Sequence, residues 1–372
     1  MKIIYPDYNN CIVNLSNSIL KYYQAEYTHN TLPELDKYLE KDYKNIIVLL
    51  YDGFGSNLIK NTLGEQSFLH SNKIKDITSV FPATTTASTT SIITGLTPVE
   101  HCWLGWNNYI KSIDKVVTMF WNVIKDTNRK AADFNIVKQE FPYTTIFDKI
   151  NKTKNAKAYC ISPFEGLSYN ADNVNEMYDS ILKLCKTNEK KFIYAYCHNP
   201  DKLMHDHGTK AQIVIDKIHY LNKKTEELSN KLTDDTLLII TADHGHMDIG
   251  EHIILNNYPK LKNMLTKDIS LEARATNFFV KDNLLKEFKK EFIKLFSNDF
   301  ILLSRQEVIN QQLFGTPTPN EQFYDCLGDY IAIGISDKII LSTPYPTPIK
   351  GEHAGITTDE VLIPLIVIDK KT

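Results

Sequence analysis

Residues 236–245 read TLLIITADHG, an apolar run that ends abruptly in an acidic residue, a histidine and a glycine. A short continuous apolar run bounded by turn residues is typical of a strand buried on both faces of a parallel sheet. Residues 210–232, just before it, carry apolar side chains at helical spacing: Val214, Ile218, Leu221 and Leu228. The stretch therefore predicts an α/β protein in which Asp243 and His244 follow a core strand.

Three other apolar runs have the same character. They are NIIVLLY at 45–51, FIYAYC at 192–197 and the run at 361–368. Helical patterns fill the intervals between them, and alternating strands and helices build a sheet with helices on both faces. We therefore predict a doubly wound, mostly parallel α/β sheet.

Chemically active side chains follow these runs at the points where the strands should end. Asp52 comes directly after the first run, and Asp201 and His205 come shortly after the second. Taken alone, each could be a turn or helix-capping residue. In an open α/β sheet, however, the carboxyl ends of the strands meet at one edge, where ligands bind. The segment GEHAG at 351–355 adds His353 among small residues just before the last run.

A second region has a different pattern. Between about residues 261 and 337, a predicted strand, helix and strand are followed by a stretch containing Gly, Pro and Asn and by another strand. We expect a small α+β cap at 261–337, inserted into a catalytic core formed by residues 1–260 and 338–372.

Composition excludes several classes of protein. The 372 residues carry 42 Lys and Arg against 45 Asp and Glu, for a formal charge of -3, which is unlike the dense basic surface of a nucleic-acid-binding protein. No apolar run approaches the roughly 18 residues that a membrane span needs. The six cysteines form no CxxC pair, which is typical of reduced thiols. With no secretory pattern near residue 1, we expect a cytoplasmic protein that acts on a small molecule.

The acidic and histidine residues at the strand ends form a coherent ligand set. Carboxylate and imidazole groups bind Zn²⁺ well, and six such groups can serve two ions at three each. Asp201 and His205 lie one helical turn apart, so both side chains can reach one ion. The sequence therefore predicts a two-metal site, with zinc favoured and other divalent metals possible.

A nucleophile candidate comes from the Ser/Thr-rich stretch at 84–94, which follows a predicted strand at 74–81. Serine and threonine often cap helices. The β-branched threonine side chain is disfavoured inside helices, however, so the repeated threonines need another explanation. One of these hydroxyl groups is a candidate nucleophile beside the metal site.

These segments together resemble a known family. Asp52 after its strand, FPATTTASTTSIITGLTPVEH at 81–101, NPDKLMH at 199–205, TADHGHM at 241–247 and GEHAG at 351–355 occur in the order and spacing of the alkaline phosphatase superfamily. The branch they most resemble is the type I phosphodiesterase/nucleotide pyrophosphatase family. Five ordered motifs spanning residues 44–368 are jointly specific, although each alone is weak.

The resemblance implies a role for each matching residue. The threonine nucleophile of the family falls on Thr85. One zinc is implied to be bound by Asp201, His205 and His353, and the other by Asp52, Asp243 and His244 together with Thr85. Ser88 stands where relatives commonly have an asparagine, so substrate preference carried over from nucleotide-cleaving members is in doubt. Asn107 and Asn108 lie near a similar pocket asparagine of the family, and either could bind a phosphoryl oxygen.

The expected activity is hydrolysis of a small phosphodiester, possibly a nucleotide, through a covalent phosphothreonine intermediate. A terminal phosphate is usually matched by a guanidinium group, and no arginine lies beside the nucleophile motif, which favours diesters over monoesters. Arg274 in the cap could still reach the site. A phosphomonoesterase or a phosphonate-ester hydrolase of the same superfamily is the alternative. A catalytically idle metal-binding interaction protein is the competing class. His207, His246 and His252 could orient ligand carboxylates, although surface or structural roles are the simpler interpretation.

Overall fold

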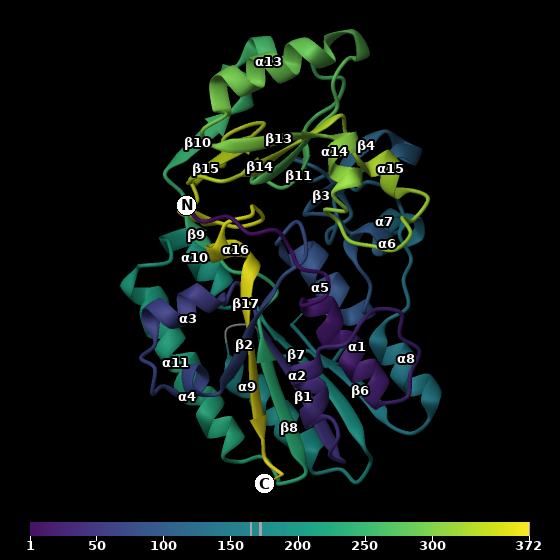
Figure 1. Cartoon of the computed structure of the whole chain (residues 1–372), viewed down its shortest axis with the longest axis vertical. Helices are drawn as coiled ribbons and strands as arrows, with labels where there is room; N and C mark the ends of the chain where they lie inside the picture. The colour runs from purple at the N-terminus through teal and green to yellow at the C-terminus, as the bar shows by residue number, and fades with distance from the viewer. Residues whose placement is uncertain (164–165, 171–172, 372) are drawn as a thin grey trace.

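The computed structural model describes residues 1–163, 166–170 and 173–371, and it has two stacked parts (Figure 1). The larger part is built on a six-stranded sheet in the order β2, β17, β8, β1, β7, β6. Its strands are β2 (Lys73–Thr78), β17 (Leu362–Asp369), β8 (Thr236–Thr241), β1 (Asn45–Tyr51), β7 (Lys191–Cys197) and β6 (Lys157–Ile161). The second part lies above it in Figure 1 and contains a seven-stranded sheet.

The predicted core strands are confirmed, with one difference in direction. Strands β1, β7, β8 and β6 are parallel, and every residue of β1, β7 and β8 is buried. Strand β17 is antiparallel to both of its neighbours, β8 and β2. A run buried on both faces does not reveal its direction in the sequence. Because β17 is antiparallel, the chain segment before it lies at the same sheet edge as the carboxyl ends of β1, β7 and β8.

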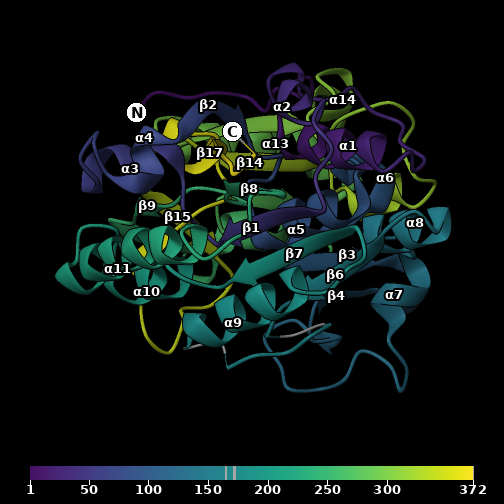
Figure 2. The same cartoon turned by 90° about the horizontal axis from the view of Figure 1, so that it is seen from below.

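Helices cover both faces of this sheet, with α9 and α11 on one side and α1 and α2 on the other (Figure 2). Tyr51 of β1 hydrogen-bonds to Thr225 of α11 at 2.7 Å, whereas Phe192 of β7 packs against Tyr23 and Phe147 near the opposite helices. The helices of this part are α1 (Ile12–Tyr22), α2 (Pro33–Tyr38), α3 (Ser56–Thr62), α4 (Phe68–Ser71), α5 (Thr85–Thr94), α8 (Ile146–Thr153), α9 (Val174–Cys185), α10 (Asp201–His207), α11 (Gln212–Ser229) and α16 (Thr358–Val361). This arrangement confirms the α/β fold class.

The second sheet draws strands from two separate stretches of chain. Its order is β13, β14, β12, β11, β3, β4, β5. The strands are β13 (Phe300–Ser304), β14 (Tyr330–Gly334), β12 (Ala275–Phe278), β11 (Ser270–Leu271), β3 (Asn107–Ile110), β4 (Lys115–Thr118) and β5 (Val123–Ile124). The cap proposed at 261–337 therefore shares its sheet with residues 107–124, which pair to it through Leu271 and Asn107. We call this whole unit the cap, while the exact division between core and cap stays a proposal.

Short elements complete the cap and its border with the core. They are α6 (Pro98–His101), α7 (Ile136–Glu140), α12 (Pro259–Lys262), α13 (Leu285–Phe296), α14 (Arg305–Asn310), α15 (Phe323–Cys326) and the 3-10 turns Lys111–Ile113, Leu255–Asn257 and Asp282–Leu284. Strand β10 (Glu251–Ile254) pairs with β15 (Lys338–Leu341), and β9 (Met247–Asp248) pairs with β16 (Gly351–Glu352). Helix α13 packs its phenylalanines into a separate apolar cluster below it.

Candidate metal centre

The acidic residues that follow three core strands lie close together, as the sequence predicts. Asp52 follows β1, Asp201 begins α10 after β7, and Asp243 follows β8. The backbone N–H of Asp201 donates to the carbonyl oxygen of Asp52 at 3.1 Å, and the N–H of Gly53 donates to Asp243 Oδ1 at 3.1 Å. Gly53 has a φ of 71°, and a Cβ there would lie 2.9 Å from the Cβ of Asp201. A glycine is therefore required for this approach of two strand ends.

The histidine before β17 reaches the same place from the other direction. Strand β16 pairs with β9 so that Glu352 lies opposite Met247. This register sets His353 beside the segment that contains His244, and the two imidazole rings stack with centroids 3.7 Å apart. His205, on α10, has its ring centroid 5.3 Å from that of His353.

The ligand atoms fall into overlapping clusters. In each, one oxygen or nitrogen per residue lies within 4.8 Å of the others. One cluster is Asp52, Asp243 and His244, which is one of the predicted triads. The second predicted triad, Asp201, His205 and His353, is divided among three clusters: Asp201 with His205 and His246, Asp201 with His244 and His353, and His205 with Glu352 and His353. The predicted ligands are therefore brought together, while their assignment to particular ions stays a prediction.

The histidine tautomers suit metal binding. His244 Nδ1 lies 2.8 Å from the Gly245 carbonyl oxygen, His205 Nδ1 lies 2.9 Å from that of Gly351, and His353 Nδ1 lies 3.0 Å from that of Ala83. A carbonyl oxygen only accepts, so each Nδ1 donates, and Nε2 is the ring nitrogen left to bind a metal. A backbone carbonyl on the far nitrogen is the usual way of orienting a histidine ligand.

The electrostatics of the cluster call for a cation. Asp52, Asp201 and Asp243 are 3%, 8% and 0% exposed. Burial, together with the neighbouring carboxylates of Asp243 and Asp201, raises the pKa of Asp52 well above its usual value. Asp243 Oδ2 is buried without a hydrogen-bond partner among the described residues. Buried carboxylates are stable as ions when they are paired or coordinate a metal, so these residues fit a divalent cation.

Thr85 lies at the edge of this cluster as the first residue of α5. Its Oγ1 lies 3.1 Å from His244 Nε2 and donates to Asp52 Oδ1 at 3.5 Å. The Thr85 hydroxyl group thus lies beside Asp52 and His244, the residues with which it would bind one ion.

The predicted substrate contacts have other partners in the structure. Ser88 has no exposed surface, and its hydroxyl lies 2.8 Å from Ser79 Oγ, which donates to the Asp243 carbonyl. Asn107 accepts from Thr118 at 2.8 Å, and buried Asn108 donates to the Cys102 carbonyl at 2.7 Å. Direct contact of Ser88, Asn107 or Asn108 with a substrate stays a prediction.

Several residues beside the ligands were missed or undervalued in the sequence. The hydroxyl of Tyr196 donates to Asp52 Oδ2. His246 Nδ1 lies 3.0 Å from Asp201 Oδ1, and Glu352 Oε1 lies 3.5 Å from His353 Nε2. The sequence indicates His246 only as a possible orienting group, and the available signal is its place two residues after His244. Tyr196 lies within an apolar strand, where the sequence gives no signal of a role at the site.

Arg274 does not reach the metal centre, and the expectation that it could is wrong. Its side chain is fully buried, and its Nε and Nη2 donate to Glu360 at 2.6 and 3.0 Å. Its Nη1 donates to the carbonyls of Ser336 and Lys338. The guanidinium group therefore joins the cap to the segment before β17.

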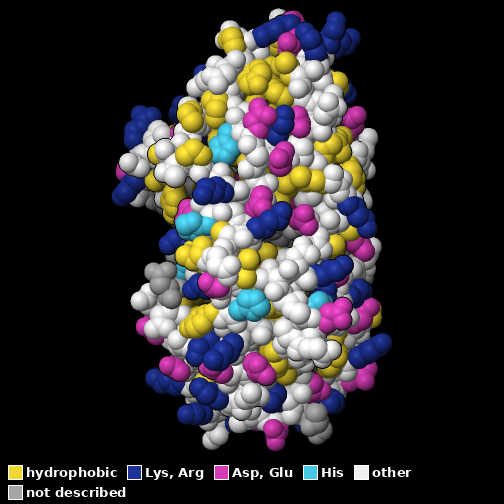
Figure 3. Space-filling view, turned by 90° about the vertical axis from the view of Figure 1, so that its left-hand side faces the viewer, with side chains coloured by type: hydrophobic (Ala, Val, Ile, Leu, Met, Phe, Trp, Pro, Cys, Tyr) yellow, Lys and Arg dark blue, Asp and Glu magenta, His cyan; other side chains and the backbone are white. Residues whose placement is uncertain are grey.

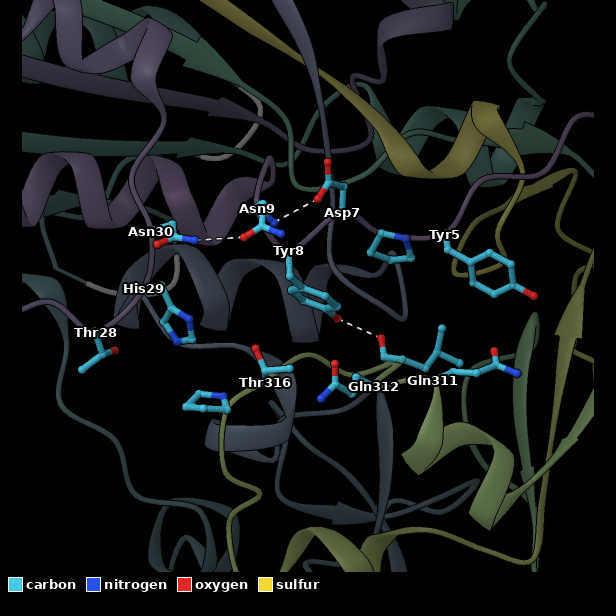
Figure 4. A pocket seen from close by; sticks show the side chains of 13 residues that line it. Tyr5, Asp7, Tyr8, Asn9, Thr28, His29, Asn30, Gln311, Gln312 and Thr316 are labelled. Carbon is cyan, nitrogen blue, oxygen red and sulfur yellow. Dashed lines mark hydrogen bonds between the residues drawn. The ribbon is translucent and has the colours of Figure 1, made fainter.

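A hollow of about 550 Å³ lies elsewhere, where the N-terminal segment meets the cap (Figure 4). Tyr8 points across it and donates its hydroxyl to the Leu313 carbonyl at 2.9 Å. None of the predicted metal ligands, all within the described ranges, lines it. The hollow is therefore separate from the candidate metal centre.

The surface carries no sign of a nucleic-acid-binding face on the side shown in Figure 3, where Lys and Arg side chains are interspersed with Asp and Glu. Over the described ranges, no helix has both the length and the apolar character required to cross a bilayer.

Comparisons with known proteins find one matching sequence family. Residues 46–294 match the sequence profile described as type I phosphodiesterase / nucleotide pyrophosphatase. A search of curated proteins finds no significant match.

Solved structures share the fold at low sequence identity. Murine ectonucleotide pyrophosphatase/phosphodiesterase 5, in an inactive form in complex with AMP, is 14% identical, with 87% of each chain covered and a TM-score of 0.66. The human protein of the same name is 17% identical, with 87% of each chain covered and a TM-score of 0.67. Phosphonoacetate hydrolase from Sinorhizobium meliloti 1021, in complex with phosphonoformate, is 15% identical, with 86% of this chain and 89% of that chain covered and a TM-score of 0.64.

Proposed function

Because the chain belongs to the type I phosphodiesterase/nucleotide pyrophosphatase family of the alkaline phosphatase superfamily, and so is a hydrolase of phosphoric esters, we propose that it is a two-metal phosphodiesterase with Thr85 as nucleophile. The observation that carries the proposal is the position of Thr85 Oγ1, 3.1 Å from His244 Nε2 and beside Asp52 at the start of α5. The superfamily is metal-dependent, and the clustered ligand atoms support two divalent ions, with zinc favoured.

Each residue has a proposed task. Asp52, Asp243 and His244 would hold one ion beside Thr85, and Asp201, His205 and His353 would hold the other. When bound, divalent cations lower the pKa of a nearby hydroxyl or water and neutralise charge on the oxygens of the ester.

The chain's own part in the reaction begins with Thr85. Its Oγ attacks phosphorus in line, so that a phosphothreonine ester forms as the bond from phosphorus to the leaving oxygen breaks. The proton lost by the Thr85 hydroxyl is passed to that departing oxygen, which leaves as the alcohol. Water then hydrolyses this ester and restores the hydroxyl. The backbone N–H of Thr85, at the start of α5, would bind a phosphoryl oxygen, as helix N-termini do in anion sites.

A diester is favoured over a monoester on the evidence of Arg274. A terminal phosphate carries one more negative charge than a diester and is commonly matched by a guanidinium group. The guanidinium of Arg274 is fully engaged by Glu360 and by two carbonyls. A panel of diester substrates identifies the leaving group.

The first experiment measures hydrolysis of a chromogenic phosphodiester with and without a chelator, in the parent protein and in Thr85→Ala. We expect chelation and the substitution each to abolish turnover. Thr89→Ala is a matched control, because Thr89 lies one turn further along α5 and its hydroxyl only donates to the Thr85 carbonyl. Chelator-insensitive turnover, or full activity in Thr85→Ala, contradicts the proposal.

The second experiment compares substrates. Dinucleotide, nucleotide and lipid-headgroup diesters are assayed beside a phosphomonoester and phosphonoacetate. The fold shared with phosphonoacetate hydrolase makes cleavage of a phosphonate the alternative function to test. Faster turnover of the phosphonate or of the monoester than of every diester would reject the diester assignment.

The cytoplasmic location also stays a proposal. Its support is that no disulfide joins any two of the six cysteines, all of which lie within the described ranges.

A further inference from the structure

Glu272 reaches from the cap to the turn that carries the nucleophile. It lies between β11 and β12, and its Oε1 accepts hydrogen bonds from Thr84 Oγ1 and from the backbone N–H of Trp106, both at 2.6 Å. We propose that Glu272 is a positioning residue that fixes the Thr84 side chain, and with it the turn that carries Thr85, at the start of α5. The inference rests on the proposed function, in which Thr85 attacks phosphorus at that helix end.

The side chain of Thr84 explains why such a residue is needed. Thr84 is the N-cap of α5, with the extended backbone typical of that position, yet its side chain makes no capping hydrogen bond. A threonine at this position ordinarily accepts from a backbone N–H of the first helical turn. Here its hydroxyl is turned toward Glu272 instead. The residue directly before Thr85 is therefore held by the cap and not by the first turn of α5.

The cap presents Glu272 through a fixed turn. The N–H of Glu272 donates to the Ala275 carbonyl at 3.2 Å, and the N–H of Ala275 donates back to the Glu272 carbonyl at 3.3 Å. The loop that carries Trp106 packs closely beneath, since a Cβ on Gly105 would lie 3.0 Å from the Cα of Leu271. Two cap segments and the core turn therefore meet at one carboxyl oxygen.

The hydrogen bonds that Glu272 accepts are the contacts on which the proposal rests. Burial, opposed by the hydrogen bond from Thr84 and assisted by the carboxylate of Glu352, raises the pKa of Glu272 to about 8. A glutamine has an amide oxygen in the same place and can accept the same two hydrogen bonds. Alanine can accept neither.

The test is a set of variants assayed on a chromogenic phosphodiester. In Glu272→Ala, the Thr84 hydroxyl is free to cap α5, which displaces the turn that carries Thr85. An N-cap hydrogen bond stabilises a helix by a free energy equivalent to a factor of roughly five to ten, so we expect kcat to fall by about that factor while KM changes less. Glu272→Gln should keep most of kcat. Thr84→Val combined with Glu272→Ala should restore kcat to the level of Thr84→Val alone, because the capping hydroxyl is gone.

Amide hydrogen exchange gives a reading that does not depend on turnover. Exchange at Thr86 and Ala87 should slow in Glu272→Ala and return to the parent rate in the double variant. Equal loss of kcat in Glu272→Gln and Glu272→Ala, additive losses in the double variant, or unchanged exchange would overturn the inference. If Thr85→Ala were fully active, the proposed function would fail, whereas the exchange measurement would still decide whether Glu272 restrains Thr84.

Discussion

Replacing Glu360 by alanine should be among the most destabilising single changes in this protein. Glu360 is fully buried and accepts five hydrogen bonds, two of them from Arg274 and the others from the backbone of Gly355 and from the backbone and side chain of Thr357. Burial is the largest single influence and acts to raise its pKa, but the charge and hydrogen bonds of Arg274, together with the hydrogen bonds from Thr357 and Gly355, hold that pKa below the usual value. The carboxylate is therefore ionised and paired.

The expected cost follows from what the substitution leaves behind. Arg274 keeps only the Ser336 and Lys338 carbonyls, so a buried positive charge loses its counter-ion. Removing one partner of a buried ion pair costs about 3–5 kcal/mol in the free energy of unfolding. For a chain of this size that corresponds to a fall in Tm of roughly 4–6 °C.

Calorimetric melting of matched variants tests this reasoning. Arg274→Met combined with Glu360→Ala should recover part of the lost stability, since no unpaired charge remains. Glu291→Ala is the surface control, because Glu291 pairs with Lys260 on an exposed part of α13 and should leave Tm unchanged within error. The reasoning is refuted if Glu360→Ala has the same Tm as the parent, or if the double variant is no more stable than Glu360→Ala.

Two other predictions concern residues around the site. Tyr196→Phe removes the hydroxyl that donates to Asp52, so zinc affinity measured by competition with a chromogenic chelator should fall about 10- to 100-fold, and unchanged affinity would count against an orienting role. Burial lowers the pKa of His101 to about 3, and its Nδ1 accepts from the Trp103 N–H while its Nε2 lies 2.9 Å from Ser91 Oγ. The folded state resists protonation of His101, so stability is full above pH about 6.5 and is lost as pH falls toward 3, by about 2 kcal/mol at pH 5. Chemical unfolding of parent and His101→Gln at pH 7 and pH 5 checks this, and an equal pH effect in both proteins would contradict it.

The core of the fold could be predicted from the sequence because apolar runs such as 236–241 are buried on both faces and end at chemically distinct residues. The direction of β17 could not, because its apolar pattern is the same in either direction. Strands β3 to β5 were also missed. They are two to four residues long and mix polar with apolar residues, and their place in the second sheet depends on pairing with Leu271, far along the chain.

The candidate site could likewise be predicted only in part. Asp52, Asp243 and His244 were predictable because they follow strands directly, and the structure brings them together. Tyr196 and Glu272 were not, because each acts through a contact with a residue at least 140 positions away in the chain, Asp52 for Tyr196 and Thr84 for Glu272. A single sequence gives no sign of such contacts.

The most direct test of the account is a crystal of the zinc-loaded protein measured at the zinc absorption edge. The account predicts two anomalous peaks, one among Asp52, Asp243 and His244 beside Thr85 Oγ1, and the other bound by Asp201 together with histidines of the neighbouring clusters. A single peak, a peak distant from Thr85, or none in the presence of ample zinc would contradict it.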